Sequence, residues 1–242
     1  MRLARFGRSL SPELVDVQAW GPGEVALYLR DLARVNRYLG GASALLRPLT
    51  RLIEADFPDP SSPFTVLDVG TGGGDLPRAL CAWARKRGRR LRVIGLDRQK
   101  EILRWAQEGS RGFGEITFMG GDARCLPCSG RAFDYVTASL LLHHFSWEEA
   151  AAILRNFTSS ARLAVLINDL RRALIPYLVI LLMTRLGTRS RLSRHDAPLS
   201  VLRAFTVEEM EGLARAAGLG AWRLERAFPY RLVLVLRCGE RV

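Results

Sequence analysis

A glycine-rich turn between an apolar run and a helical pattern constrains this chain more than any other stretch. The run Val66-Leu67-Asp68-Val69 leads into the turn Gly70-Thr71-Gly72-Gly73-Gly74-Asp75, and residues 76–87 then follow a helical pattern. Because glycine has no Cβ, the backbone can turn sharply there and approach a ligand closely. The first N–H groups of the helix remain free to bind that ligand. The stretch therefore predicts a strand, a turn and a helix around a nucleotide-type pocket.

Two phosphate-binding patterns do not fit this turn. A dinucleotide fingerprint needs a third glycine, but Asp75 stands there when the count starts at Gly70, and Pro77 when it starts at Gly72. No Lys-Ser or Lys-Thr pair closes the loop as a P-loop requires. A carboxylate in the turn would repel a pyrophosphate and would suit a ligand that carries a positive charge. The turn therefore favours a cofactor with a cationic part.

Later apolar runs alternate with helical patterns and end in polar residues. The strand-like runs are 92–97, 116–119, 132–139 and 162–167, and helical patterns cover 100–107 and 147–156. This alternation predicts a parallel sheet with right-handed crossovers, in which ligands bind at the carboxyl ends of the strands. Asp97 ends the second strand, where an acid can accept hydrogen bonds from both hydroxyls of a ribose.

Four blocks of the chain resemble, in order, the motifs of class I S-adenosylmethionine-dependent methyltransferases of the small-molecule type. The blocks are 66–75, 95–98, 121–127 and 133–144, within residues 64–170. The resemblance implies S-adenosylmethionine as the cofactor. It also implies a set of cofactor-binding residues: Asp68, Gly70, Thr71, Gly72, Asp75, Asp97, Arg98, Asp122, Ala123, Ser139 and Leu140.

The resemblance also implies a role for many of these residues. Gly70 and Gly72 would line the methionine and ribose, and Asp97 would hold the ribose hydroxyls. Asp122 would bind the adenine amino group with Ala123 beside it. Ser139 and Leu140 would lie beneath the methionyl portion. Thr71 replaces the usual Cys or Ser, and Asp75 is an acceptable acid in this turn.

The expected fold is α/β: a doubly wound, Rossmann-like sheet of seven mostly parallel strands. Strands at 222–226 and 230–236 are expected to form a C-terminal antiparallel hairpin, after a helix at 207–217 that Thr206 and Glu209 would cap. Residues 1–60 are expected to form a separate N-terminal helical cap or lid, with helices at 24–38 and 44–53. The methyltransferase domain is then 61–242. A packed cap and a substrate lid remain equal alternatives for the N-terminal part.

The segment 170–200 is expected to form a basic, apolar helical insertion after the fifth strand. Its apolar stretch, 173–183, is too short to span a bilayer, and arginines follow at 185, 189, 191 and 194. No acid occurs between Leu170 and His195. Three interpretations stay open: a buried helix with an exposed arginine tail, a lid over a lipophilic acceptor, or peripheral membrane contact through 170–194.

The candidate catalytic residues are the three histidines of the chain. Methyl transfer displaces a neutral leaving group from a sulfonium, so no metal is expected, whereas a hydroxyl acceptor needs a base. His143 and His144 follow the fourth strand, and His195 lies beside Asp196. An imidazole titrates near neutral pH and suits this role.

Two further residues are candidates for holding the substrate. Asp169, after the fifth strand, is a candidate for orienting the acceptor. Arg172 is a candidate for holding an acidic group on it.

The net charge of +12 favours anionic partners, although a plain solvated surface explains it as well. Nucleic acid is not expected, because Thr137-Ala138-Ser139-Leu140 stands where base-amino methyltransferases carry an Asn/Asp-Pro-Pro-aromatic motif. Cys125 and Cys128 have zinc spacing, but no second pair completes a site. With no disulfide framework and no secretory pattern, the expected location is cytoplasmic, with peripheral membrane attachment as a variant.

These features predict methyl transfer to a small lipophilic acceptor, on oxygen. Phenolic, quinone-like and polyketide-type molecules are the expected acceptors, and residues 170–205 are weakly similar to bacterial methyltransferases of that kind. The alternatives are an RNA methyltransferase and a non-catalytic protein that keeps the cofactor pocket and serves as a membrane or partner adaptor. The sequence leaves the oligomeric state open.

Overall fold

Seven strands form one sheet in the order β3-β2-β1-β4-β5-β7-β6. The computed structural model describes residues 7–17, 20–38, 40–127, 130–218 and 220–238. The strands are β1 (Phe64–Val69), β2 (Leu91–Asp97), β3 (Ile116–Gly120), β4 (Phe133–Ser139), β5 (Ala161–Leu170), β6 (Trp222–Ala227) and β7 (Arg231–Arg237). β1 to β5 are parallel, and β7 is antiparallel to both β5 and β6. The predicted doubly wound sheet with a C-terminal hairpin is confirmed.

The order of the strands creates a switch point beside β1. From β1 the chain moves outward to β2 and β3, and then returns to β4 on the other side of β1. Crossovers on the two sides of such a point run to opposite faces and leave a crevice at the carboxyl ends of the strands. The glycine-rich turn follows β1 directly and so lies at this crevice.

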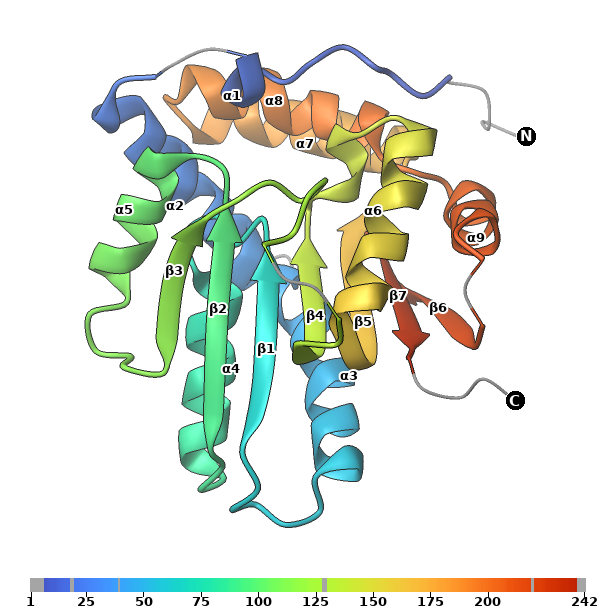
Figure 1. Cartoon of the computed structure of the whole chain (residues 1–242). Coiled ribbons are helices and arrows are strands. Elements are labelled where there is room, and N and C mark those ends of the chain that lie inside the picture. Colours follow the sequence, from blue (N-terminus) through green and yellow to red (C-terminus); the bar gives the residue numbers. More distant parts are fainter. Residues whose placement is uncertain (1–6, 18–19, 39, 128–129, 219, 239–242) are drawn as a thin grey trace.

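Helices cover both faces of the sheet (Figure 1). One face packs against α3 (Gly41–Asp56) and α4 (Asp75–Lys86), and the other against α6 (Trp147–Ser160) and α9 (Val207–Ala216). Along β5, Ala164 and Leu166 belong to the first interface, whereas Val165 and Ile167 belong to the second. A strand that is buried on both faces carries apolar side chains at successive positions. This is why apolar and polar residues do not alternate along 162–167.

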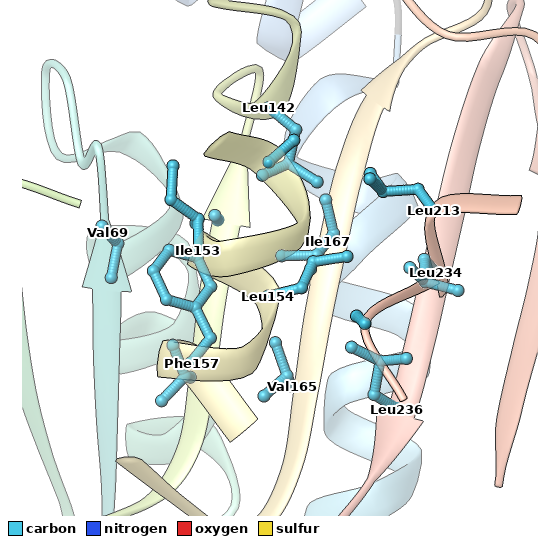
Figure 2. Packing of buried hydrophobic residues seen from close by; sticks show 14 of the residues in the cluster. Val69, Leu142, Ile153, Leu154, Phe157, Val165, Ile167, Leu213, Leu234 and Leu236 are labelled. Carbon is cyan, nitrogen blue, oxygen red and sulfur yellow. The ribbon is translucent and has the colours of Figure 1, made fainter. Parts of the chain in front are cut away.

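The α6 side holds the largest core cluster of the described residues (Figure 2). Ile153, Leu154 and Phe157 of α6 belong to the same cluster as Leu213 of α9, which lies near Leu234 of β7. Both helices begin with a capping box, Ser146 with Glu149 in α6 and Thr206 with Glu209 in α9. The predicted cap of α9 is confirmed, and these caps satisfy the first N–H groups where the helices start.

A further layer of helices crosses the carboxyl ends of the strands (Figure 1). It consists of α1 (Leu14–Val17), α7 (Leu174–Gly187) and α8 (Arg191–Arg203), with α2 (Pro22–Tyr38) packed against α3, α5 (Lys100–Gly109) and α8. The short 3-10 helix η1 (Leu142–His144) follows β4 and packs against α8. Residues from the start of the chain and from the insertion after β5 thus meet above the crevice.

The insertion is helical as expected, but α7 is not a buried helix. Pro176 is its only buried residue, and Leu186 is 81% exposed. The interpretation of 173–183 as a buried helix is therefore wrong, because α8 covers only part of the surface of α7. Among the described residues, no helix is long and apolar enough to cross a membrane.

Candidate functional site

A cavity of about 640 Å³ lies between the sheet and the helices above it. Its volume is within the range of small-molecule sites, roughly 300–1,000 Å³. One end is formed by the glycine-rich turn and the carboxyl ends of β1, β2 and β4. The other end is formed by residues 10–17, α2, α7 and α8. We call these the cofactor end and the acceptor end.

The turn at the cofactor end is held by its own backbone. The N–H groups of Gly70 and Thr71 donate to the carbonyl oxygen of Leu96 at 2.8 and 3.0 Å. Gly70 has φ +66°, and a Cβ there would lie 2.8 Å from Cδ1 of Leu141. Both the conformation and the space therefore require glycine at position 70.

Asp68 fixes the turn to the sheet. Its buried carboxylate accepts hydrogen bonds from Thr71 Oγ1 and Thr137 Oγ1, both at 2.8 Å. Burial raises the pKa of Asp68 to about 6, although the two hydroxyl donors oppose the shift. Thr71, which replaces the Cys or Ser usual at this position of the motif, therefore donates its hydroxyl hydrogen to Asp68 in this chain.

Asp97 and Asp122 follow adjacent strands and face the same cavity. Asp97 accepts hydrogen bonds from the N–H groups of Gly72 and Gln99 at 3.0 and 3.1 Å, and burial raises its pKa. Asp122 is paired with Arg124 at 2.6 Å, which lowers the pKa of the Asp122 carboxyl. Asp75 pairs with Arg78 at 2.6 Å at the start of α4.

The end of β4 carries a strained residue. Leu140 has φ +56°, a conformation that is rare outside glycine and is found where the surrounding structure enforces it. Its N–H donates to the carbonyl oxygen of Asn168 at 2.8 Å, and the Asn168 amide donates to Ser139 Oγ at 2.8 Å. β5 thereby enforces the shape of the chain where the methionyl portion was predicted to lie.

The residues at the cofactor end fit S-adenosylmethionine. All of the predicted cofactor residues line the cavity: Asp68, Gly70, Thr71, Gly72, Asp75, Asp97, Arg98, Asp122, Ala123, Ser139 and Leu140. The cradle at Gly70 leaves no space for a Cβ, and the carboxylates that follow β2 and β3 suit hydroxyl and amino groups of a nucleoside. Which of these residues contact the cofactor stays a prediction.

At the acceptor end, two histidines are each held by an aspartate. Nδ1 of His143 lies 2.6 Å from Asp169 Oδ1, and Nδ1 of His144 lies 2.6 Å from Asp16 Oδ2. A third carboxylate, Glu13, faces the other side of both rings: its Oε1 is 3.5 Å from His143 Nε2 and its Oε2 is 3.8 Å from His144 Nε2. We call Glu13, His143 and His144 the histidine cluster, and all three line the cavity.

Burial and charge act in opposite directions on the histidine cluster. Burial alone would lower the pKa of His143, but Asp169 and Glu13 outweigh it and raise that pKa to about 10. Burial would likewise raise the pKa of Glu13, yet His143 and His144 hold it below its ordinary value. The negative field of these carboxylates therefore favours positive charge between the rings.

The sequence analysis missed Glu13, Asp16 and Arg203. The buried Arg203 donates to the carbonyl oxygens of His143 at 3.1 Å and His144 at 2.6 Å, and also to that of Ser11. It thus ties η1 to the N-terminal segment. For Glu13 and Asp16 the sequence did contain one indication of a role: they are the only acids among the first 23 residues.

Three predicted site residues lie away from the cavity. Asp169 is buried against His143, and Arg172 forms an ion pair with Glu209 at 2.6 Å. His195 pairs with Asp196 at 2.7 Å and lines a separate shallow pocket between α7 and α8. Of the predicted catalytic and substrate residues, only His143 and His144 line the cavity. Among the cysteines, Cys125 is free and exposed, and Cys128 lies outside the described residues.

The sheet with its antiparallel hairpin, and the acids that follow β1, β2 and β3, define the class I methyltransferase fold. Residues 66–162 match the family described as a methyltransferase domain. Residues 66–162 therefore form a class I S-adenosylmethionine-dependent methyltransferase domain, and the predicted class and cofactor are confirmed.

Two curated proteins are similar over part of the chain. Demethylmenaquinone methyltransferase of Porphyromonas gingivalis is 37% identical over 90 residues, which are 36% of each chain. 2-Phytyl-1,4-naphtoquinone methyltransferase of Thermosynechococcus vestitus is 38% identical over 73 residues, 30% of this chain and 31% of the relative. The chain thus spans about a third of the length of the curated relatives it matches.

One similar solved structure is human N-acetylserotonin methyltransferase in complex with S-adenosylmethionine. It has a TM-score of 0.65 and 15% identity, and the match covers 91% of this chain and 57% of the human one. At this identity the likeness bears on the fold alone.

Proposed function

We propose that this protein methylates a small lipophilic acceptor, with S-adenosylmethionine as the methyl donor. One observation carries the proposal: a single cavity joins the glycine-rich turn to an acceptor end rich in apolar side chains. That end includes Leu10, Val17, Leu32, Val35, Ile180 and Met183. The phenolic, quinone-like or polyketide-type acceptor expected from the sequence suits such a lining, and the names of the two curated relatives support a quinone-like one.

At the cofactor end, this chain's task is to bind and orient the donor. Asp97 has the position to accept hydrogen bonds from the ribose hydroxyls, and Asp122 from the adenine amino group. Bound S-adenosylmethionine supplies a methyl group on a positively charged sulfur. Asp68 and Leu140 hold the backbone of the turn and of the β4 end in place, so that the acceptor and the donor meet at a fixed angle.

At the acceptor end, this chain's task is to ionise a hydroxyl of the acceptor. We assign this step to the histidine cluster. The side chain of His144 is 19% exposed, whereas those of His143 and Glu13 are only 2% and 1% exposed. His144 is therefore the member that acts on the acceptor, and Asp16 fixes the orientation of its ring. The expected product is an oxygen methyl ether.

The outer face of α7 supports delivery of the acceptor from an anionic lipid surface. Ile175, Leu178, Leu182 and Leu186 are exposed and follow a helical spacing on one side. Arg185 lies in the last turn of α7, and further arginines follow in the chain at 189, 191 and 194. An apolar stripe flanked by arginines suits attachment to acidic headgroups, while Ile180 and Met183 of the same helix line the cavity.

The experiment that tests the proposal uses S-adenosylmethionine labelled with ¹³C in its methyl group. The protein is incubated with an alkylated phenol, with a demethylated naphthoquinone and with total RNA in separate reactions. Label in the phenol or the quinone is expected, and the ¹³C chemical shift distinguishes a methyl ether from a methyl on carbon. Label in RNA alone would contradict the substrate class. Binding of the cofactor without transfer to any of these pools would favour the non-catalytic adaptor.

A further inference from the structure

We propose that the histidine cluster binds a divalent transition-metal ion, through Glu13, Nε2 of His143 and Nε2 of His144. The candidate ligand atoms lie within 4.8 Å of one another. They come from the N-terminal segment and from η1, which Arg203 holds together. The inference deepens the proposed function, on which its catalytic consequence rests.

The unsatisfied nitrogen of His143 points to such an ion. His143 is 1% exposed, and its Nε2 has no hydrogen-bond partner among the described residues. It faces Glu13 Oε1 at 3.5 Å, whereas an N–H···O hydrogen bond spans about 2.7–3.2 Å. A buried nitrogen without a hydrogen-bond partner is destabilising, and the carboxylate beside it makes the space between the two a favourable place for a cation.

The separations around Glu13 suit two ligands of one ion. Two ligand atoms that each lie 2.0–2.1 Å from zinc, at a tetrahedral angle, are about 3.3–3.4 Å apart. The distances from Glu13 to the two Nε2 atoms, 3.5 and 3.8 Å, are close to this value. Ser200 Oγ donates to Glu13 Oε1 at 2.9 Å and Arg203 Nε lies 3.8 Å from the same oxygen, so these contacts hold the carboxylate beside the rings.

The outer partners of the two histidines match those of metal ligands. A carboxylate only accepts hydrogen bonds, so Asp169 and Asp16 each fix the proton on Nδ1 of their histidine. Metal-binding histidines commonly have such a carboxylate partner, which orients the ring and leaves Nε2 for the ion. Here both rings have one, and both Nε2 atoms face the same third carboxylate.

Two imidazoles and one carboxylate favour zinc or another divalent transition ion over magnesium or calcium. Three protein ligands leave a coordination position open, as catalytic sites require. Because all three ligands line the cavity, the open position would face the acceptor. With the ion bound, both nitrogens of His144 are occupied, so the ion and not the imidazole would lower the pKa of the bound hydroxyl and hold its oxygen for methylation. The expectation that no metal is involved would then be wrong.

The test measures metal binding directly. Protein freed of metal with a chelator is mixed with zinc chloride, separated from free metal by gel filtration and analysed for bound zinc. Cobalt chloride is used in parallel, because its visible spectrum distinguishes nitrogen and oxygen ligands from thiolates. One equivalent bound without thiolate absorption is expected. Glu13→Gln and His144→Ala should each weaken binding at least tenfold, and Asp16→Asn about 10–100-fold.

His195→Ala is the matched control. It removes the remaining histidine, which also pairs with an aspartate but lies in the other pocket. It should leave the stoichiometry and affinity unchanged. Less than a tenth of an equivalent bound to the wild type would overturn the proposal. So would binding that survives both Glu13→Gln and His144→Ala, or that is lost in His195→Ala.

The metal site and the proposed function fail separately. Binding of S-adenosylmethionine, measured by calorimetry, also verifies that each variant is folded. Methyl transfer that persists in metal-free protein would overturn the role of the ion and leave the methyltransferase intact. Metal binding by a protein that transfers no methyl group would overturn the proposed function and leave the metal site intact.

Discussion

The two ends of the cavity are built in different ways. The cofactor end is formed by the glycine-rich turn and the ends of neighbouring parallel strands, whose backbone groups bind one another, as those of Gly70 and Leu96 do. The acceptor end is formed by side chains that are far apart in the sequence, such as Glu13 and His143. The first end is thus a property of the fold, and the second a property of this chain.

We expect that substitutions other than those of Asp16, which pairs with both His144 and Arg98, can disable the two ends independently, and the largest expected effect is at the acceptor end. His144→Ala removes the most exposed member of the histidine cluster. It should lower the rate of methyl transfer about 10²–10⁴-fold, the usual contribution of a group that ionises the acceptor. The affinity for S-adenosylmethionine should stay within about threefold of wild type. Steady-state rates with ¹³C-labelled donor check the first part, and calorimetry checks the second. Equal losses in rate and cofactor affinity would contradict the separation of the two ends.

At the cofactor end, Asp97→Ala should weaken the binding of S-adenosylmethionine about 100-fold. Two hydrogen bonds from ribose hydroxyls to a carboxylate are lost, each worth about 1.5–3 kcal/mol when made. Calorimetry measures the change. Glu115→Ala is the matched control, because Glu115 precedes the adjacent strand but pairs with Arg85 on the surface. An unchanged affinity in Asp97→Ala would refute the role of Asp97.

Much of the cofactor end was predictable because its signals are local. The strand, the turn and Asp97 lie within about 30 residues, and fixed spacing in the sequence means fixed spacing in the fold. The acceptor end offered no such pattern. Glu13 meets His143 only because α8 and η1 bring the N-terminal segment above β4, and no periodicity in 8–17 indicates that contact. Likewise, the apolar stretch of α7 was evident, but which face stays exposed depends on how α8 packs.

A third prediction concerns the stability of the cofactor end. The pKa of Asp68 is raised from 3.8 to about 6, so between these values the folded state binds more protons than the unfolded state. The free energy of unfolding should therefore fall as the pH rises from about 4 to 6, by up to about 3 kcal/mol from this residue. Urea unfolding of the wild type and of Asp68→Asn across this range measures the effect. A curve for Asp68→Asn with the same slope as the wild type would contradict it.

The smallest expected effect concerns the outer surface of the acceptor end. Arg185→Gln combined with Arg189→Gln should weaken binding to phosphatidylglycerol vesicles, by about fivefold for each arginine at low salt. Arg85→Gln combined with Arg87→Gln, at the end of α4, is the control of equal charge change. Flotation with the vesicles and with neutral phosphatidylcholine vesicles measures binding. Equal flotation with both lipids would show that these arginines do not contact the membrane.

Calorimetry with S-adenosylmethionine on the wild type, Asp97→Ala and Glu13→Gln shows whether the cofactor binds and whether the two ends of the cavity act separately. The wild type and Glu13→Gln should bind the cofactor with affinities within about threefold of each other, whereas Asp97→Ala should bind it about 100-fold more weakly. No binding to the wild type at millimolar cofactor would contradict the cofactor assignment. An equal loss in Glu13→Gln and Asp97→Ala would contradict the division of the cavity into two independent ends.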